Sequence, residues 1–218
     1  MITLALEFSS AQRSVAIARN GEVLASAAET GDPRVTNAFS LIEKVLAQAK
    51  VSREEIEQIA VGLGPGSYTG VRAAIALAQG WQLARGVKLI GVSSAEAIAA
   101  RAQAEGILGR VNVVIDAQRG EFYLAVWDIF AASPDTQRVE VSALKIVSTA
   151  EIATLTQKRE SCVGPAAEKV LYPDAVTVAK LATTPSKSIP EAQLEPIYLR
   201  ETTFVKAQKP ENSFQVGQ

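Results

Sequence analysis

Residues 62–72 form a glycine-rich segment that constrains the fold more than any other part of this chain. They read Gly-Leu-Gly-Pro-Gly-Ser-Tyr-Thr-Gly-Val-Arg, and they join an apolar run at residues 59–61 to a stretch rich in alanine. Glycine lets the backbone turn sharply and lets its N–H groups approach another group closely. A helix N-terminus adds unpaired donors and a partial positive charge. The segment therefore predicts either a phosphate cradle or a tight junction between a strand and a helix.

Of these two interpretations we favour the tight junction. Four glycines suit close packing of a strand on a helix, and no lysine follows Gly66 and Ser67 as it would in a Walker loop. The chain also contains no histidine, which removes the commonest general base and metal ligand. A loop built like a nucleotide site in a chain without histidine indicates a catalytic fold that no longer performs its own chemistry.

Composition narrows the class of protein further. The 218 residues, 48% of them hydrophobic, suffice for one large domain or two lobes of about 100 residues each. A formal net charge of -1 provides no overall basic field for nucleic acid. The single Cys162 excludes an internal disulfide, and we expect it to be a small core residue. Because the start of the chain lacks a signal peptide and no apolar run reaches ~20 residues, we expect a cytoplasmic protein.

Hydrophobic periodicity predicts strands that alternate with helices. The expected strands cover residues 2–8, 14–19, 22–28, 58–63, 88–92, 111–115, 122–127, 138–147 and 161–163. The expected helices cover residues 37–50, 69–85, 93–106, 149–155 and 165–171. Asn20-Gly21 predicts a hairpin turn, and Ser52 with Glu55 predicts a capping box on a short helical turn. Beyond residue 183 we expect an extended tail.

The pattern of the first strands begins again after residue 106. Residues 113–116 repeat an apolar strand that ends in an acid, as residues 4–7 do, and a basic turn and a returning strand follow in both places. An internal duplication is the simplest explanation. We therefore expect an α/β fold of two lobes, residues 1–106 and 107–218, each with a mixed sheet and flanking helices.

Five segments of the chain resemble the TsaB (YeaZ) family, in the family's order. They are residues 4–16, 64–72, 91–93, 116–123 and 196–200. The glycine loop and the Asp-Ala-x-x-Gly-Glu segment that begins at Asp116 are the most specific of these. The duplicated strand and hairpin, with an acid at the end of each first strand, is also similar to the actin, Hsp70 and sugar-kinase (ASKHA) superfamily. The resemblance implies an actin-like fold with two lobes.

The resemblance also implies a non-catalytic subunit in tRNA modification. TsaB-like proteins pair with the homologous enzyme TsaD and with the ATPase TsaE, and together they transfer a threonylcarbamoyl group to the adenosine beside the anticodon of tRNAs reading ANN codons. For this chain the resemblance implies a heterodimer with TsaD, a homodimer when alone, and contact with TsaE in the assembled complex. It implies no cofactor, no metal and no catalytic residue, and tRNA would be contacted indirectly.

Three departures, one from the enzymes and two from the relatives, are visible in the residues. TsaD-like enzymes hold a metal through two histidines on their first long helix, whereas residues 37–50 offer Asn37, Ser40, Glu43 and Lys44. Residues 33–37 lack the single histidine that many TsaB proteins keep, and Glu7 stands where relatives commonly carry aspartate.

Helices 37–50 and 69–85 carry more apolar surface than one sheet can bury. The second is small on almost every face, which permits close approach of another helix. The expected partner interface comprises Phe39, Ile42, Val45, Leu46, Ala73, Ala74, Leu77, Gly80, Trp81 and Ala84. The alternative is that the rest of the chain covers both helices. The resemblance favours the interface, because TsaB-like proteins use these helices in a four-helix bundle with TsaD or with themselves.

Glu7 and Asp116 end apolar strands at positions where the superfamily places catalytic or metal-linked acids. A buried carboxylate needs a partner, so we expect either an ion pair, with Arg13 and Arg119 as the nearest candidates, or a hydrogen-bonded turn. The expected degenerate cleft comprises Glu7, Gly64, Pro65, Gly66, Ser67, Tyr68, Thr69, Gly70, Arg72 and Asp116.

Two enzymatic alternatives remain open. One is a small ATP-dependent phosphotransferase that uses Glu7 or Asp116 as base and the glycine loop on phosphate. The other is a metal-independent peptidase with Ser67 or Thr69 as nucleophile, which would need a lysine or carboxylate to replace histidine as the activating group.

Overall fold

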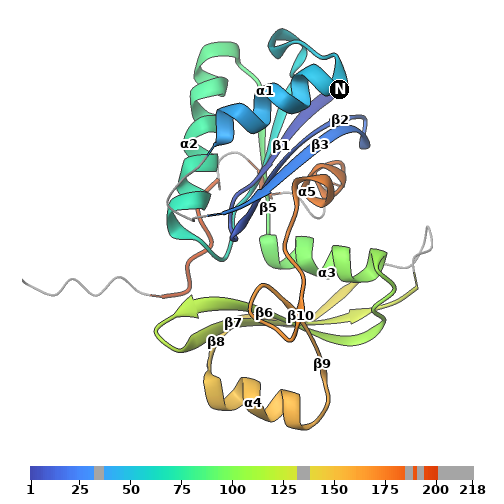
Figure 1. The fold of residues 1–218 in the computed structure, drawn as a ribbon, viewed down its shortest axis with the longest axis vertical. Coiled ribbons are helices and arrows are strands. Elements are labelled where there is room, and N and C mark those ends of the chain that lie inside the picture. The colour runs from blue at the N-terminus through green and yellow to red at the C-terminus, as the bar shows by residue number, and fades with distance from the viewer. Residues whose placement is uncertain (32–36, 132–137, 185–188, 191–193, 201–218) are drawn as a thin grey trace, which may run out of the picture.

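The computed structural model describes residues 1–31, 37–131, 138–184, 189–190 and 194–200, which fold into two lobes, one above the other in Figure 1. The strands are β1 (Ile2–Glu7), β2 (Gln12–Arg19), β3 (Glu22–Thr30), β4 (Gln58–Gly62), β5 (Lys88–Val92), β6 (Gly109–Gln118), β7 (Glu121–Ile129), β8 (Val139–Ser148), β9 (Ser161–Gly164), β10 (Lys169–Val170) and β11 (Ile189–Pro190). The helices are α1 (Ala38–Ala49), the 3-10 turn η1 (Arg53–Glu55), α2 (Tyr68–Arg85), α3 (Ser94–Ala104), α4 (Thr149–Gln157) and α5 (Ala175–Leu181).

The two sheets repeat one topology. The first has the order β11-β5-β4-β1-β2-β3 and the second β10-β9-β6-β7-β8, so that apart from β11 both read fifth, fourth, first, second, third. In each sheet the first three strands are antiparallel, and the fourth pairs in parallel with the first. Glu7 lies opposite Ser14, and Asp116 lies opposite Phe122, at the same end of each first hairpin. The predicted duplication and the actin-like fold class are therefore confirmed.

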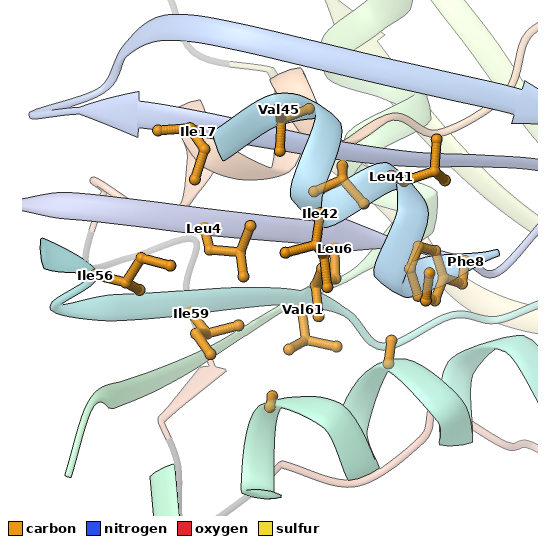
Figure 2. Packing of buried hydrophobic residues seen from close by; sticks show 14 of the residues in the cluster. Leu4, Leu6, Phe8, Ile17, Leu41, Ile42, Val45, Ile56, Ile59 and Val61 are labelled. Atoms are coloured by element: carbon orange, nitrogen blue, oxygen red, sulfur yellow. The ribbon is translucent and has the colours of Figure 1, made fainter. Parts of the chain in front are cut away.

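The main core of the first lobe lies between its sheet and the helices α1 and α2. Leu4 and Leu6 of β1 point to this side with Ile59 and Val61 of β4, and α1 covers them with Ile42 (Figure 2). The opposite face of the same strands carries alanine, and α5 packs there. Because β1 is central and covered on both faces, all six of its residues are buried. The expected capping box is present, since Ser52 N–H donates to Glu55 Oε2 at 2.8 Å, and Ser93 caps α3 by accepting from Glu96 N–H at 3.5 Å.

The helix α3 lies between the two sheets (Figure 1). Ala97 packs with the alanine-rich core of the first lobe, whereas Ile98, Ala99 and Ala102 pack in the core of the second. The expected boundary near residue 106 falls between α3 and β6. The chain later returns, since α5 packs on β1 and β2 and β11 pairs with β5. The segments α5 and β11 therefore belong to the first lobe, although their residues lie within the expected second lobe, 107–218.

In the second half of the chain one predicted helix is wrong and one observed helix was not predicted. The expected helix at residues 165–171 is a turn followed by β10, because Lys169 and Val170 pair with Val163 and Gly164 at the edge of the sheet. The helix α5 was not expected, and its N-terminus is capped by Asp174, whose Oδ1 accepts from Thr177 N–H at 2.7 Å. Much of the expected tail beyond residue 183 lies outside the described residues, as do residues 33–36 of the segment that lacks the family histidine.

Candidate functional site

The glycine loop between β4 and α2 packs directly against the segment that follows β1. A Cβ atom at Gly66 would overlap the carbonyl oxygen of Ser9, and one at Gly70 would overlap the carbonyl oxygen of Phe8. The N–H of Ser67 donates to Ser9 O at 2.6 Å, so the loop and this segment are hydrogen-bonded as well as in contact. Glycine is required here because another backbone occupies the space of its missing side chain.

Other donors of the loop are also engaged within the chain. Gly64 N–H donates to Ser94 Oγ at 3.0 Å, and Ser94 N–H donates back to Gly64 O at 2.8 Å. Ser67 caps α2, because its Oγ accepts from Gly70 N–H at 3.3 Å. A bound phosphate would have to displace these protein oxygens. The contacts therefore support the packing interpretation of the loop over the phosphate cradle.

Glu7 lies beneath this loop with 0% of its surface exposed. Its Oε1 accepts from Ser9 N–H at 2.7 Å and its Oε2 accepts from Ser94 Oγ at 2.7 Å. Burial raises the pKa of the carboxyl above its ordinary value of 4.5, while the hydrogen bonds from Ser9 and Ser94 oppose that rise. A Cβ at Gly62 would overlap the Glu7 carboxylate, so the side chain fills the space beside β4. This buried carboxylate is thus held in place by groups of its own chain.

Asp116 lies two residues before the end of β6 and makes a similar local contact in the second lobe. Its Oδ1 accepts from Gln118 N–H at 2.7 Å, two residues ahead, as Glu7 accepts from Ser9. Its Oδ2 accepts from Gln118 Nε2 at 2.7 Å, and the residue is exposed. Of the two expected alternatives, the hydrogen-bonded turn is the one seen at both acids. Glu7, Ser67 and the glycines thus lie together around residues 8–9, while Asp116 lies on the other sheet.

Ser67 and Thr69, the nucleophiles of the peptidase alternative, do not lie in surroundings that suit catalysis. Ser67 Oγ serves as the helix cap, and Thr69 is exposed at the first turn of α2. Cys162 is half-buried in β9 and packs against a small core cluster, so it is less enclosed than expected. Burial, followed by Glu160 and Glu168, raises the pKa of its thiol, which disfavours the thiolate. Among the described residues no group of three or more cysteines, aspartates and glutamates is placed to hold a metal ion.

The helices α1 and α2 divide the expected interface residues into two sets. Four of them are buried in the core of the first lobe, and of these four only Ile42 borders a surface groove: Ile42, Val45, Leu46 and Ala74. The others are exposed or half-buried: Phe39, Ala73, Leu77, Gly80, Trp81 and Ala84. Most of the apolar stripe of α1 is therefore covered by the chain's own core.

The outward face of α2 is apolar and is left uncovered by the described residues. Leu83 is 91% exposed, and Phe39 of α1 is 70% exposed. A Cβ at Gly80 would meet nothing within 4 Å, so this position faces open space. Leu83 was not among the expected interface residues. Its spacing of three from Gly80 and seven from Ala76 puts it on the same helix face and could have identified it.

A groove of about 280 Å³ separates α1 from α2 on this side. Its apolar lining residues are Phe39, Ile42, Trp81 and Ala84, and its charged lining residues are Glu43, Arg53, Glu54 and Arg85. Arg53 forms an ion pair with Glu43, and Arg85 donates to the carbonyl oxygen of Glu54 at 3.3 Å. The groove therefore combines an apolar surface with charged groups that already have partners.

The first turn of α2 carries Tyr68 and Arg72 of the expected cleft. Arg72 Nη1 donates to Tyr68 Oη at 2.8 Å, and the guanidinium lies 5.1 Å from the centre of the Tyr68 ring. Tyr198 stacks on Tyr68 with ring centres 5.3 Å apart. This contact, and the role of Ser94 beside Glu7, were not predicted, although Tyr198 lies in one of the five resembling segments.

Curated relatives of this chain have names that refer to tRNA modification. The chain is 34% identical over 125 residues to "tRNA threonylcarbamoyladenosine biosynthesis protein TsaB" of Escherichia coli (strain K12), covering 57% of this chain and 54% of the relative. It is 32% identical over 129 residues to the protein of the same name from Haemophilus influenzae, covering 56% and 52%. The chain thus spans about half the length of the curated relatives it matches.

Solved structures share the fold over nearly the whole chain. "YeaZ from Pseudomonas aeruginosa" superposes with a TM-score of 0.73 at 22% identity, covering 91% of this chain and 99% of that one. A second structure from the same organism, described as similar to peptidase YEAZ, gives a TM-score of 0.75 at 24% identity with the same coverage. At these identities the likeness establishes the fold.

The fold and the site define an actin-like protein of two lobes whose glycine loop is filled by its own chain. A family model described as "TsaD: tRNA N6-adenosine threonylcarbamoyltransferase" matches residues 32–185. The chain belongs to this family and, within it, to the TsaB (YeaZ) group, as the five sequence segments predicted. No helix in the described part of the chain is long and apolar enough to span a membrane.

Proposed function

We propose that this protein is a non-catalytic scaffold subunit in the synthesis of threonylcarbamoyladenosine in tRNA. It binds a TsaD-type enzyme through the outward face of α2 and the adjacent edge of α1. TsaE joins at the assembled complex, tRNA is contacted through the enzyme, and the modified adenosine lies beside the anticodon of tRNAs reading ANN codons. In the absence of the enzyme, the same face pairs with a second copy of this chain. The names of the curated relatives support the pathway.

The observation that carries this proposal is Gly80. Glycine inside a helix costs about 1 kcal/mol relative to alanine, and among the residues that the structure describes no neighbouring atom excludes a Cβ there. The intramolecular packing therefore gives no reason for glycine at this position. A second helix that crosses close to α2 would give one, because small residues at the crossing let two helix axes approach.

The surroundings of Gly80 fit a partner helix. Leu83 and Phe39 supply exposed apolar area on either side of it, and the groove between α1 and α2 can accept an apolar side chain. The partnered charges at the groove edge would remain at a polar rim, which is the usual composition of a protein interface. These features support a helical partner rather than a small-molecule ligand.

The second part of the proposal is that this chain has no catalytic activity of its own. The loop donors of Gly64, Ser67 and Gly70 are bonded to oxygens of the chain, and Glu7 is held by Ser9 and Ser94. These contacts weigh against the phosphotransferase, and the capping role of Ser67 weighs against the peptidase. We therefore expect the lone chain to show no magnesium-dependent nucleotide binding in calorimetry.

Gel filtration of the chain mixed with its cognate TsaD tests the interface. Leu83→Glu places a charge in the proposed contact and should abolish the heterodimer, because an unpaired buried charge is strongly unfavourable. Leu108→Glu is the matched control, since Leu108 is 49% exposed just before β6 in the second lobe. Ala74 was also expected at the interface, but Ala74→Arg would not test it, because Ala74 is buried in the chain's own core. Heterodimer formation by Leu83→Glu at wild-type affinity would contradict the proposed face.

A further inference from the structure

Residues 194–200 cross from the first lobe to the second beside the glycine loop, and they are drawn in red in Figure 1. Leu194 is buried in the core of the first lobe. Ile197 N–H donates to the carbonyl oxygen of Leu63 at 2.9 Å, at the point where β4 becomes the glycine loop. This segment is therefore anchored to the first lobe by a side chain and by a backbone hydrogen bond.

The same segment contacts the first turn of α2. The rings of Tyr198 and Tyr68 stack with an interplanar angle of 23°. Tyr68 in turn accepts a hydrogen bond from Arg72, one turn further along the helix. The start of α2 thus has an aromatic contact with a segment about 130 residues away in the sequence.

Two residues further on, Arg200 reaches the second lobe. It donates to the carbonyl oxygen of Ala117 at 3.2 Å and to the carboxylate of Glu121. These acceptors flank the turn between β6 and β7, in which Gln118, Arg119 and Gly120 all have positive φ. Arg200 therefore ties residues 194–200 to one defined hairpin.

We propose that residues 194–200 are a clasp that holds the β6–β7 hairpin of the second lobe against the N-terminal turn of α2. The clasp spans the two lobes beside the glycine loop, and it sets the position of the helix that carries the outward apolar face. If that face binds the enzyme as proposed above, the state of the clasp and the affinity for the enzyme are coupled, and that last step alone rests on the proposed function.

The clasp is suited to opening without unfolding of the chain. The side chains of Arg200 and Glu121 keep 32% and 45% of their surface exposed, and ion pairs in such positions contribute little to stability. Local opening of weakly held segments is detected by hydrogen exchange, which reports the population of the open form at each amide.

Amide hydrogen exchange of the full chain tests the proposal with the variants Arg200→Gln and Arg110→Gln. Arg110 pairs with Asp128 across the same two strands, at 3.0 Å, at the other end of the β6–β7 hairpin from the turn that Arg200 contacts. Arg110→Gln therefore removes a comparable ion pair elsewhere on the hairpin. We expect Arg200→Gln to accelerate exchange about three- to tenfold at Ile197, Gly70 and Val71, and Arg110→Gln to leave these amides unchanged. Glu121→Gln should reproduce the effect of Arg200→Gln.

Three results would overturn the clasp. Acceleration confined to residues 197–200, with wild-type rates at Gly70 and Val71, would show that α2 is independent of it. Equal acceleration in both arginine variants would show general destabilisation, and unchanged exchange in Arg200→Gln would show that the contact carries no constraint.

The coupling to the enzyme is measured on the same variants by the dissociation constant of the TsaD complex. Weaker binding by Arg200→Gln, with wild-type binding by Arg110→Gln, is the expected result. Equal affinity in both variants would overturn the coupling while the proposed function stands. If the wild-type chain itself failed to bind TsaD, the proposed function would fail, and the exchange rates would still decide whether the clasp exists.

Discussion

At the scale of single residues, Glu7 shows how a side chain at a catalytic-looking position can be structural. It accepts hydrogen bonds from Ser9 and Ser94 and fills the space beside Gly62. Its position at the end of β1 was predicted from the apolar run before it. Burial was expected for both acids, but only Glu7 is buried, whereas Asp116 at the matching position of the second lobe is exposed. The difference arises from α3 and the glycine loop, which cover Glu7 through long-range contacts that no local pattern contains.

The raised pKa of Glu7 predicts a pH dependence of stability. Below pH 4.5 the carboxyl is neutral in both the folded and the unfolded chain, so it contributes no penalty. As the pH rises above 4.5, the unfolded chain ionises first, and the folded chain becomes less stable relative to it. The free energy of unfolding of Glu7→Gln should therefore gain on that of the wild type as the pH rises from 4.5, in urea titrations at several pH values. A difference that shrinks over this range would mean that the pKa is lowered in the fold.

Gly66 should be among the least replaceable residues of the loop. Its φ is +148°, and a Cβ would overlap the carbonyl oxygen of Ser9. Gly66→Ala is expected to lower the free energy of unfolding by about 2–4 kcal/mol, because both backbone strain and a steric clash must be relieved. Chemical denaturation measures this change. A loss below ~1 kcal/mol would show that the loop can move away from Ser9 and that its packing is not tight.

At the scale of elements, hydrophobic periodicity predicted the strands and helices that have a regular apolar pattern. It failed where contacts with distant parts of the chain determine the secondary structure. The strands β1 to β9 and the helices α1 to α4 were expected close to their observed positions. The helix α5 was missed because its seven residues include the β-branched Val176, Thr177 and Val178, and it forms by packing on β1 and β2. Residues 169–170 became strand because the edge of β9 offered hydrogen bonds.

The same distinction applies to the expected interface. The apolar stripe of α1 was recognised, but periodicity shows only that a helix has an apolar face and not what covers that face. The sheet covers Val45 and Leu46, and the exposed remainder is Phe39. On α2 small residues occupy both sides, so the sequence alone does not distinguish the face that packs on the sheet from the face that points outward. The structure was needed to tell them apart.

Gly80→Ala separates the stability of α2 from its proposed contact. The free energy of unfolding should rise by about 1 kcal/mol, because alanine favours the helix and its Cβ meets no atom of the described part of the chain within 4 Å. The affinity for TsaD should fall about tenfold, since overpacking at a close helix contact costs ~1–3 kcal/mol. Denaturant unfolding and titration calorimetry measure the two quantities. A stabilised variant with unchanged affinity would mean that no helix crosses at Gly80.

At the scale of the whole molecule, the chain has a duplicated actin-like fold. Its glycine loop is hydrogen-bonded to other parts of the chain, and the outward apolar face of α2 is not covered by the described residues. The duplication could be predicted because an apolar strand, an acid and a turn recur about 109 residues apart, as Leu4 and Val113 show. The return of α5 and β11 to the first lobe could not, because it depends on pairing between distant parts of the chain. We therefore propose that the helices bind the partner and that the two acids have only a structural role.

The most direct test of this account is the formation of threonylcarbamoyladenosine in a reconstituted reaction with tRNA, TsaD, TsaE and the threonylcarbamoyl donor. Product should require both TsaD and this chain, should be lost with Leu83→Glu, and should persist with Asp116→Asn, which retains the turn oxygen that accepts from Gln118. Product formed by this chain without TsaD, or a loss of product with Asp116→Asn while the TsaD complex still forms, would contradict the assignment of a scaffold.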